Sequence, residues 1–357
     1  MKHLILLSLA VLVPTIWALP QGCVAVRSIA GFSSDILFEN IQPSDKWLFN
    51  ISNRYFEASS TIKGKQYITD TLVTNRIYNM NISVNRILID GWSLDMIVPV
   101  SVNSRNNGGD HKGLGTLPRY TTRSFGLGDI RFTVYKWLLP FSANKKGNIQ
   151  VGLGLKLPTG DYKYQDYFVR NDSTKVLAPV DQAIQLGDGG TGITTELNAY
   201  YHLNKTINLF GNFYYLVNPR EQNGVSNLKG RSATAIEKIN TSTEMSVPDQ
   251  YSLRGGANFQ LNRIVFSAGL LYERVPSEDL IGGNKGFRRA AYVGSVEPGI
   301  IYKIKNFLVY GYVAIPFQRH TLQSLPDKLT TKYSGNYTIT QGGFADYLVY
   351  TGISIKL

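Results

Sequence analysis

Apolar and polar side chains alternate along most of the chain beyond residue 46. Tyr78, Met80, Ile82 and Val84, for example, are separated by asparagine or serine at every intervening position. In residues 149–157 every odd position holds isoleucine, valine or leucine. Because successive side chains of a β-strand point to opposite faces, this pattern predicts strands that have one apolar and one polar face.

Twelve segments of this kind are predicted, each roughly 10 to 14 residues long. They span about 47–57, 77–87, 92–103, 126–138, 148–158, 192–203, 207–217, 250–261, 264–274, 290–303, 307–317 and 346–357. A tilted strand of this length can cross a lipid bilayer. Beyond residue 20 no apolar run is long enough for a spanning helix, so any crossing would be made by strands.

The connections between these segments are of two kinds. Five are short, at about 90–91, 144–147, 204–205, 262–263 and 305–306, and six are long, at about 58–76, 104–125, 159–191, 218–249, 275–289 and 318–345. The two kinds alternate, as they do in barrels with short periplasmic turns and long extracellular loops. We predict an all-β fold in which residues 47–357 form an antiparallel transmembrane β-barrel of about 12 strands. A soluble β-sandwich or propeller is the alternative.

The first 46 residues are predicted to lie outside the barrel wall. Residues 1–20 combine a basic start with an apolar run too short for a spanning helix, which is typical of a signal peptide. Residues 21–46 are expected to form a periplasmic or plug segment, because 24–32 is apolar and the lumen is the nearest place to bury it. Cys23 follows the expected cleavage region, so it is either lipidated or a structural thiol.

The composition of the chain supports this interpretation, and the chain carries a net positive charge. The chain has 22 tyrosines, 16 phenylalanines and 34 glycines, and its formal net charge is +12. A basic exported protein suits an anionic membrane surface or an anionic solute better than nucleic acid. The expected partners are therefore outer-membrane lipid and lipopolysaccharide, a small-molecule solute and the barrel-insertion machinery, with no nucleic acid, no cofactor and no metal.

Charged residues occur within the predicted strands, on the polar face opposite the apolar stripe. They are Arg54, Asp95, Asp129, Arg131, Lys156, Glu196, Arg254, Glu273, Glu297 and Lys356. Because charges facing lipid are costly, these side chains are expected to line the lumen. They would then either fill the barrel as structural ion pairs or line a solute path. Asp129 and Lys156 lie on either side of one predicted hairpin, so we expect them to form a salt bridge, direct or through one neighbour.

The loop that follows the fifth segment carries Tyr162, Tyr164, Tyr167 and Phe168 beside Lys163 and Arg170. Aromatic and basic side chains together could bind an organic anion at the mouth of the barrel. The favoured alternative is an interfacial aromatic girdle at the top of the fifth strand. Gly152 and Gly154, in the strand itself, are expected to make space for a bulky neighbour in the lumen.

Catalytic signals in the sequence are weak. Beyond residue 20 the histidines are His111, His202 and His320, and neither an HExxH nor a GxSxG motif occurs. Barrel phospholipases need a serine and a histidine together on the outer face, and His320 with a rim serine is the one opening for such an activity. We therefore expect a protein that is not an enzyme.

Two stretches resemble a known family. Gly126-Leu127-Gly128-Asp129-Ile130 and the residues 154–161 (GLKLPTGD) resemble the "MetA-pathway of phenol degradation" family of transporter-like outer-membrane barrels, and the overall style resembles a Bacteroidetes outer-membrane protein. The resemblance implies a barrel that passes small, hydrophobic or aromatic compounds. Many outer-membrane proteins end on an aromatic residue, whereas this chain ends Ile355-Lys356-Leu357. Insertion by the usual machinery is still expected.

These observations favour an outer-membrane channel or transporter for small solutes that works by passive passage through a charged lumen. A structural or surface-binding barrel with a filled lumen is the alternative.

Overall fold

The computed structural model describes residues 46–58, 60–68, 73–111, 120–139, 146–171 and 173–357. The predicted signal peptide and Cys23 lie outside the described residues, as does the proposed plug segment apart from its last residue. All twelve predicted strand segments are present. They correspond to β1 (Trp47–Ala58), β4 (Thr74–Ile87), β5 (Trp92–Asn106), β6 (Thr121–Leu127) with β7 (Arg131–Trp137), β8 (Gly147–Lys156), β11 (Gly192–His202), β12 (Ile207–Val217), β15 (Gln250–Leu261), β16 (Ile264–Val275), β17 (Ala291–Ile304), β18 (Phe307–Thr321) and β20 (Leu348–Lys356).

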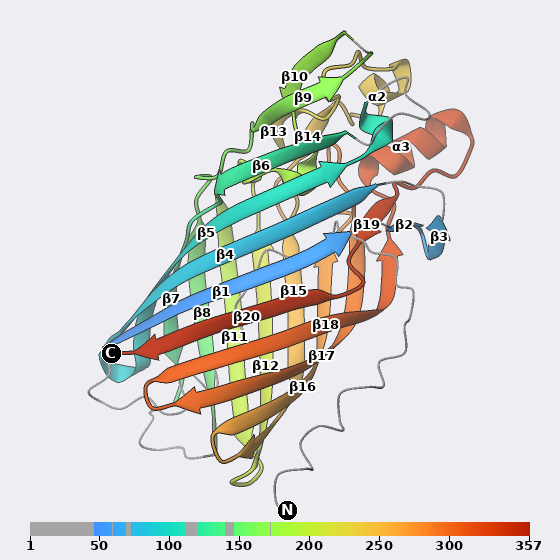
Figure 1. Ribbon diagram of the computed structural model, residues 1–357. Helices are drawn as coiled ribbons and strands as arrows, with labels where there is room; N and C mark the ends of the chain where they lie inside the picture. Colours follow the sequence, from blue (N-terminus) through green and yellow to red (C-terminus); the bar gives the residue numbers. More distant parts are fainter. Residues whose placement is uncertain (1–45, 59, 69–72, 112–119, 140–145, 172) are drawn as a thin grey trace, which may run out of the picture.

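These strands form one closed antiparallel barrel. The sheet runs β4-β1-β20-β18-β17-β16-β15-β12-β11-β8-β7-β5-β6, and a further pairing of β4 with β5 closes it. Because β6 and β7 are two halves of one strand, the barrel has 12 strands. The strands cross the barrel at a pronounced tilt (Figure 1). Closure pairs the strands on both sides, as a membrane-spanning sheet requires, except that the half-strand β6 pairs with β5 alone.

The long connections gather at one end of the barrel and carry their own small elements (Figure 1). They are β2 (Ser60–Lys63), β3 (Gln66–Ile68), η2 (Gly108–Asp110), β9 (Gln165–Val169), β10 (Lys175–Pro179), η3 (Gln182–Ile184), β13 (Gln222–Ser226), α2 (Ala235–Ile239), β14 (Glu244–Ser246), α3 (Leu325–Ser334) and β19 (Gly342–Phe344). The short connections, including η1 (Ile89–Gly91), lie at the other end. None of the helices in the described ranges is long and apolar enough to cross a membrane.

The fourth strand is interrupted, whereas the sequence predicted it as continuous over 126–138. In β5, Val100 pairs with Leu127 but Ile97 pairs with Arg131, so one extra residue is present on the β6–β7 side. The residue opposite this bulge is Pro99, which has no N–H to donate to a neighbouring strand. Its carbonyl instead accepts a hydrogen bond from the Gly128 amide (2.8 Å). The bulge therefore follows from a proline that the strand pattern did not take into account.

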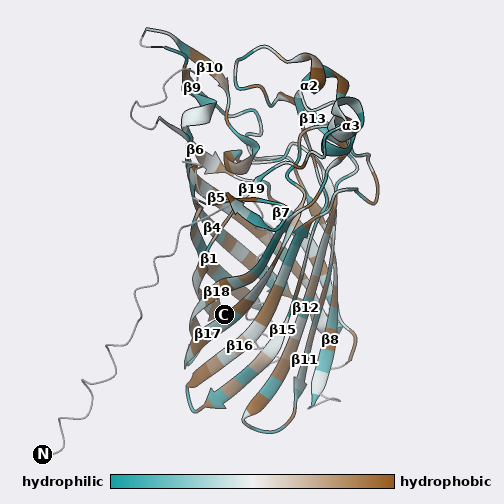
Figure 2. Cartoon of the chain, turned by 90° about the vertical axis from the view of Figure 1, so that its right-hand side faces the viewer, coloured by the Kyte–Doolittle hydropathy of each residue, from teal (hydrophilic) through white to brown (hydrophobic). Residues whose placement is uncertain are grey.

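The two faces of the barrel wall differ in polarity. On β8, Leu153 and Leu155 are 62% and 50% exposed on the outer face, whereas Gln150 and Lys156 are buried inside. Brown and teal positions alternate along the strands in Figure 2, as this arrangement requires. An outer face of exposed leucine, isoleucine, valine and phenylalanine is stable against lipid and costly in water.

Inside the barrel, aromatic rings pack onto glycines of the neighbouring strand. Tyr312 of β18 is 2% exposed and lies on Gly299 of β17, where a Cβ atom would overlap its ring. Tyr310 lies in the same way on Gly352 of β20. Gly152 of β8 makes room for the ring of Tyr135, as expected from the sequence. Tyr310, Tyr312 and the aliphatic side chains around them line the lumen on the β16–β20 side.

Gly154 differs from this pattern. Its nearest neighbours are the Thr194 and Thr133 hydroxyls and the Phe132 carbonyl, so the space is taken by the adjoining strands rather than by a bulky side chain. The expectation of a bulky lumen neighbour at this position was wrong.

The contact between Gly299 and Tyr312 gives a test of the packing inside the barrel. We expect Gly299→Ala to lower the free energy of unfolding by about 1–3 kcal/mol, because the buried ring of Tyr312 has no space to move into. Gly311→Ala on the adjacent strand is the matched control, since the nearest atom to its Cβ would lie at 3.8 Å. Urea unfolding of the refolded protein measures both; equal effects would contradict the packing described here.

Candidate functional site

The long loop between β8 and β11 turns back into the mouth of the barrel. The part that enters the mouth is the 3-10 helix η3; Val180, which precedes it, and Ile184, its last residue, are fully buried. Both pack in the same core cluster as Phe56 and Ile77 of the barrel wall. The Ile184 carbonyl accepts hydrogen bonds from Asn103 (3.4 Å) and from the Ser124 hydroxyl. This inserted loop, residues 180–190, therefore narrows the lumen at the end that carries the long connections.

One carboxylate holds the inserted loop in place. Asp181 caps η3 by accepting a hydrogen bond from the Ala183 amide (3.0 Å). Both of its oxygens also accept from Arg289, at 2.9 Å each, and Lys229 Nζ lies 2.8 Å from Oδ2. Arg105 Nε, at the end of β5, is 3.6 Å from the same oxygen. Three cations from three separate segments thus converge on a carboxylate that is 0% exposed.

A second carboxylate completes this ion network. Asp110 lies 2.8 Å from Arg105 Nε and 2.7 Å from Lys229 Nζ. Burial raises the pKa of Asp181, but the charges of Arg105, Arg289 and Lys229 lower it more, so the pKa lies well below the ordinary value. For Asp110, burial again opposes Arg105 and Lys229, and the pKa is lowered. Both acids are therefore ionised at neutral pH.

These pKa shifts predict how the inserted loop responds to acid. A carboxyl group whose pKa is depressed in the folded state stabilises that state above its unfolded pKa, and this contribution is lost as the pH falls through the folded pKa. For Asp181 the loss begins only below the ordinary value of 3.8. Current through the refolded protein in planar bilayers should thus show no acid-triggered increase between pH 7 and pH 5. An opening step in that range would contradict the assignment.

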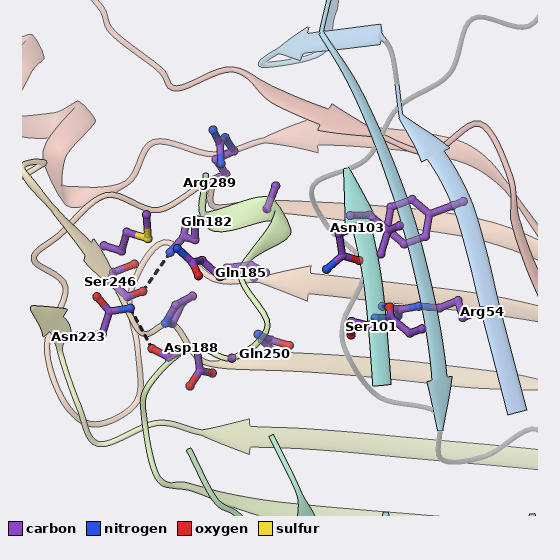
Figure 3. A pocket seen from close by; sticks show the side chains of 18 residues that line it. Arg54, Ser101, Asn103, Gln182, Gln185, Asp188, Asn223, Ser246, Gln250 and Arg289 are labelled. Atoms are coloured by element: carbon purple, nitrogen blue, oxygen red, sulfur yellow. Dashed lines mark hydrogen bonds between the residues drawn. The ribbon is translucent and has the colours of Figure 1, made fainter. Parts of the chain in front are cut away.

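Beneath the inserted loop lie two adjoining cavities, of which Figure 3 shows the larger. The larger, of about 110 Å³, separates the barrel wall at Arg54, Ser101 and Asn103 from the loop residues Gln182 and Gln185. The smaller, of about 30 Å³, is lined by residues that include Asp129, Arg131 and Lys156. The cavities share the lining residues Arg54, Asn79, Ser101, Asp188 and Gln250. The two cavities therefore adjoin one another in the upper lumen, next to the inserted loop.

The predicted contact between Asp129 and Lys156 is present. Lys156 Nζ lies 3.7 Å from Asp129 Oδ2 and is also bound by Asp188, a residue of the inserted loop. The bulge shifts the register, so that Lys156 pairs across the hairpin with Arg131. Asp129 additionally accepts hydrogen bonds from the backbone amides of Gly160 (3.0 Å) and Asp188 (3.2 Å). This group ties the loop to the wall.

The remaining predicted charges lie at inward positions of the strands. Arg54, Glu196, Arg254, Glu273 and Glu297 are buried, and Asp95, Arg131 and Lys356 are half-buried. Arg254 Nε donates to Glu297 (2.7 Å), and the Tyr135 hydroxyl donates to Glu196 (2.7 Å). Arg254 and Glu297 thus form an ion pair within the barrel, whereas Glu196 bonds a neutral tyrosine. Their role in solute passage stays a prediction.

The aromatic residues of the β8–β11 loop do not form the girdle that the sequence favoured. Phe168 is fully buried and stacks on His111 within the loops, and Tyr164 packs against the core cluster. Tyr167 is 57% exposed on β9, and the Tyr162 ring lies beside Lys163 and Arg220. The loop leaves the wall immediately after β8, so its rings cannot reach the lipid-facing surface of that strand.

An aromatic row on the outer face is built by other strands. Tyr215, Tyr251, Tyr272, Tyr292 and His320 lie on β12, β15, β16, β17 and β18, with successive ring centroids 5.5, 6.3, 5.7 and 5.3 Å apart. The strand alternation contained this signal for the four tyrosines, which lie near the long-loop ends of predicted strands, whereas His320 was predicted to lie in a loop. His320 Nδ1 is 3.1 Å from the Tyr292 hydroxyl, and no serine contact of His320 occurs within the described ranges.

Sequence reasoning missed the ion network around Asp181. Asp181, Arg105, Lys229 and Arg289 come from segments far apart in the chain, and three of them lie in loops without a periodic pattern. The only local signal is an aspartate directly before a short helical turn, which is a common capping arrangement. Nothing in that signal indicates which cations would meet the carboxylate.

Comparison with known proteins identifies structures that are similar in fold. No family model and no curated protein matches the sequence. An outer-membrane channel from Pseudomonas putida F1 superposes with a TM-score of 0.58 over 89% of this chain and 98% of that one, at 11% identity. The chain is therefore similar in fold to an outer-membrane channel, and the resemblance of residues 126–161 to the phenol-degradation family remains a resemblance.

Two further matches have lower scores. The translocator domain of the autotransporter NalP from Neisseria meningitidis gives a TM-score of 0.46 at 8% identity, covering 91% of this chain and 92% of that one. The toluene transporter TbuX from Ralstonia pickettii gives 0.39 at 9% identity, covering 88% and 90%. These names state what the matched proteins are, and neither is carried over to this chain.

Proposed function

We propose that this protein is an outer-membrane channel that lets small solutes, including hydrophobic or aromatic compounds, pass through its lumen without a cofactor. The observation that carries this proposal is the pair of adjoining cavities beneath the inserted loop, each lined by both polar and apolar side chains. A barrel whose lumen served only as a packed core would have no reason to leave space there. An exposed apolar wall, which suits lipid, and a fold similar to an outer-membrane channel support the same function.

A filled structural barrel is the second candidate, and one observation favours it. Below the cavities, Tyr310, Tyr312 and Tyr350 are at most 6% exposed, and the Arg254–Glu297 pair is buried beside them. Passage of a solute would require these side chains to move. The channel proposal therefore includes a lumen that opens transiently, whereas the structural alternative has one that stays closed.

Electrical recording from the refolded protein in planar bilayers separates these two functions. The channel proposal predicts discrete current steps of small conductance. Folded, inserted protein that never conducts would favour the structural barrel. Swelling of liposomes in small neutral sugars provides a second measurement, because it detects uncharged solutes that carry no current.

The proposal also fixes an orientation in the membrane. We expect the long connections to face the outside of the cell and the short ones the periplasm. An epitope tag within 218–249 should bind antibody on intact cells, whereas a tag at 204–205 should bind only after the outer membrane is permeabilised. The opposite labelling would require the barrel to be inverted.

A further inference from the structure

The smaller of the two cavities is lined by Arg131, a cation that forms no salt bridge within the described residues. Arg131 lies at the start of β7, and within the described part of the chain no carboxylate comes within 4.0 Å of its guanidinium. Its Nε atom is buried and makes no hydrogen bond to another described residue. The contact that it does make is with the ring of Tyr214, 5.7 Å from the centroid. A buried donor without a partner is costly, so such a group is a place where a ligand can bind.

The acids near Arg131 are engaged elsewhere. Asp129 and Asp188 both bind Lys156 and accept backbone hydrogen bonds as well. Glu196 is close enough to interact electrostatically with Arg131, but its carboxylate accepts from the Tyr135 hydroxyl. Four cationic side chains line the two cavities, against two anionic ones. The space therefore has an excess of positive charge.

Part of the lining of the smaller cavity is aliphatic. Ile97 and Pro99 of β5, Leu186 of the inserted loop and Leu216 of β12 lie around the same space. Cavities of about 30 and 110 Å³ are much smaller than the several hundred Å³ of a drug-sized pocket, so the ligand must be small. A cation beside aliphatic walls suits a molecule with one anionic group and a compact apolar body.

We propose that Arg131 forms a binding site for small organic anions, with an aromatic carboxylate such as benzoate as the representative ligand. The inference rests on the proposed function and names a solute class for it. The carboxylate accepts hydrogen bonds from the Arg131 guanidinium in the smaller cavity, and the ring, which needs more than about 30 Å³, extends past Leu186 into the larger cavity. Arg131 thus selects anions among the small solutes that reach the upper lumen.

Direct binding tests this site independently of conduction. The probe is benzoate, with benzyl alcohol as the neutral compound of the same shape, measured by calorimetry or ligand-observed NMR on refolded protein. Arg131→Gln should weaken benzoate binding at least about tenfold and leave benzyl alcohol unchanged, because a charge-assisted hydrogen bond is lost. Arg131→Lys should retain part of the affinity. Lys136→Gln removes the same charge from the same strand at a position that contacts Trp92 and the Asp90 carbonyl, and should change neither.

The possible outcomes separate this inference from the proposed function. Benzoate binding that depends on Arg131 in a protein that never conducts would support the site and overturn the channel. Current steps without benzoate binding, or binding that Arg131→Gln leaves intact, would overturn the site and leave the channel. Equal affinity for benzoate and benzyl alcohol would also overturn the site.

Discussion

Replacing Asp181 by asparagine should release the inserted loop and raise the conductance of the barrel. The substitution keeps the shape of the side chain but removes the charge that Arg289, Lys229 and Arg105 share. Removing one partner of a buried ion pair costs roughly 3–5 kcal/mol, because the remaining charges are left without compensation. Asparagine can still cap η3, so the expected release of the loop comes from the loss of the ion network alone. Single-channel recording and limited proteolysis near residues 180–190 measure the two effects.

The control for Asp181 is a carboxylate that forms an exposed pair. Glu278 lies 2.6 Å from Lys328 in the outer loops, with side chains 63% and 47% exposed. Exposed pairs contribute at most about 1 kcal/mol, so Glu278→Gln should leave conductance and proteolysis unchanged. If Asp181→Asn behaved like this control, the loop would be held by its apolar contacts alone. Val180 and Ile184 would then be the residues to replace.

The barrel was predictable because its cause is local and repeated. In each strand, apolar residues that face lipid alternate with polar residues that face the lumen, and this alternation is visible in the sequence. The alternation of short and long connections indicates the topology. The inward position of the charged residues was predictable from the same alternation. The contact between Asp129 and Lys156 was also predictable, because a hairpin places residues at equal distance from its turn close together.

The remaining features depend on contacts between distant segments. Whether residues 180–190 extend into solvent or fold into the lumen is decided by Asp181 and the cations around it, which no periodicity connects. The girdle was assigned to the wrong residues because a loop rich in tyrosine has the composition of a membrane interface whichever way it turns. The bulge at Pro99 was missed because the pattern of apolar residues continues through it.

The largest loss of stability is expected from Arg254, in the middle of the barrel. Its guanidinium donates to both Glu297 oxygens (2.7 and 3.4 Å) and interacts electrostatically with Glu273 on the intervening strand. All three side chains are at most 4% exposed. Arg254→Met leaves two buried carboxylates without their cation, so we expect a loss of about 3–5 kcal/mol in the free energy of unfolding. Urea unfolding in phospholipid vesicles measures it.

A second arginine pair with the same chemistry provides the comparison. Arg76 lies 2.7 Å from Glu57 across two adjacent strands, but its side chain is 60% exposed at the rim. Arg76→Met should therefore cost no more than about 1 kcal/mol. Glu297→Gln should cost less than Arg254→Met, because Arg254 keeps its interaction with Glu273. The double variant Arg254→Met, Glu297→Leu should recover part of the loss, since an apolar pair removes one uncompensated carboxylate. Equal losses at Arg254 and Arg76 would mean that water reaches the middle of the lumen freely, which would itself favour an open channel over a filled barrel.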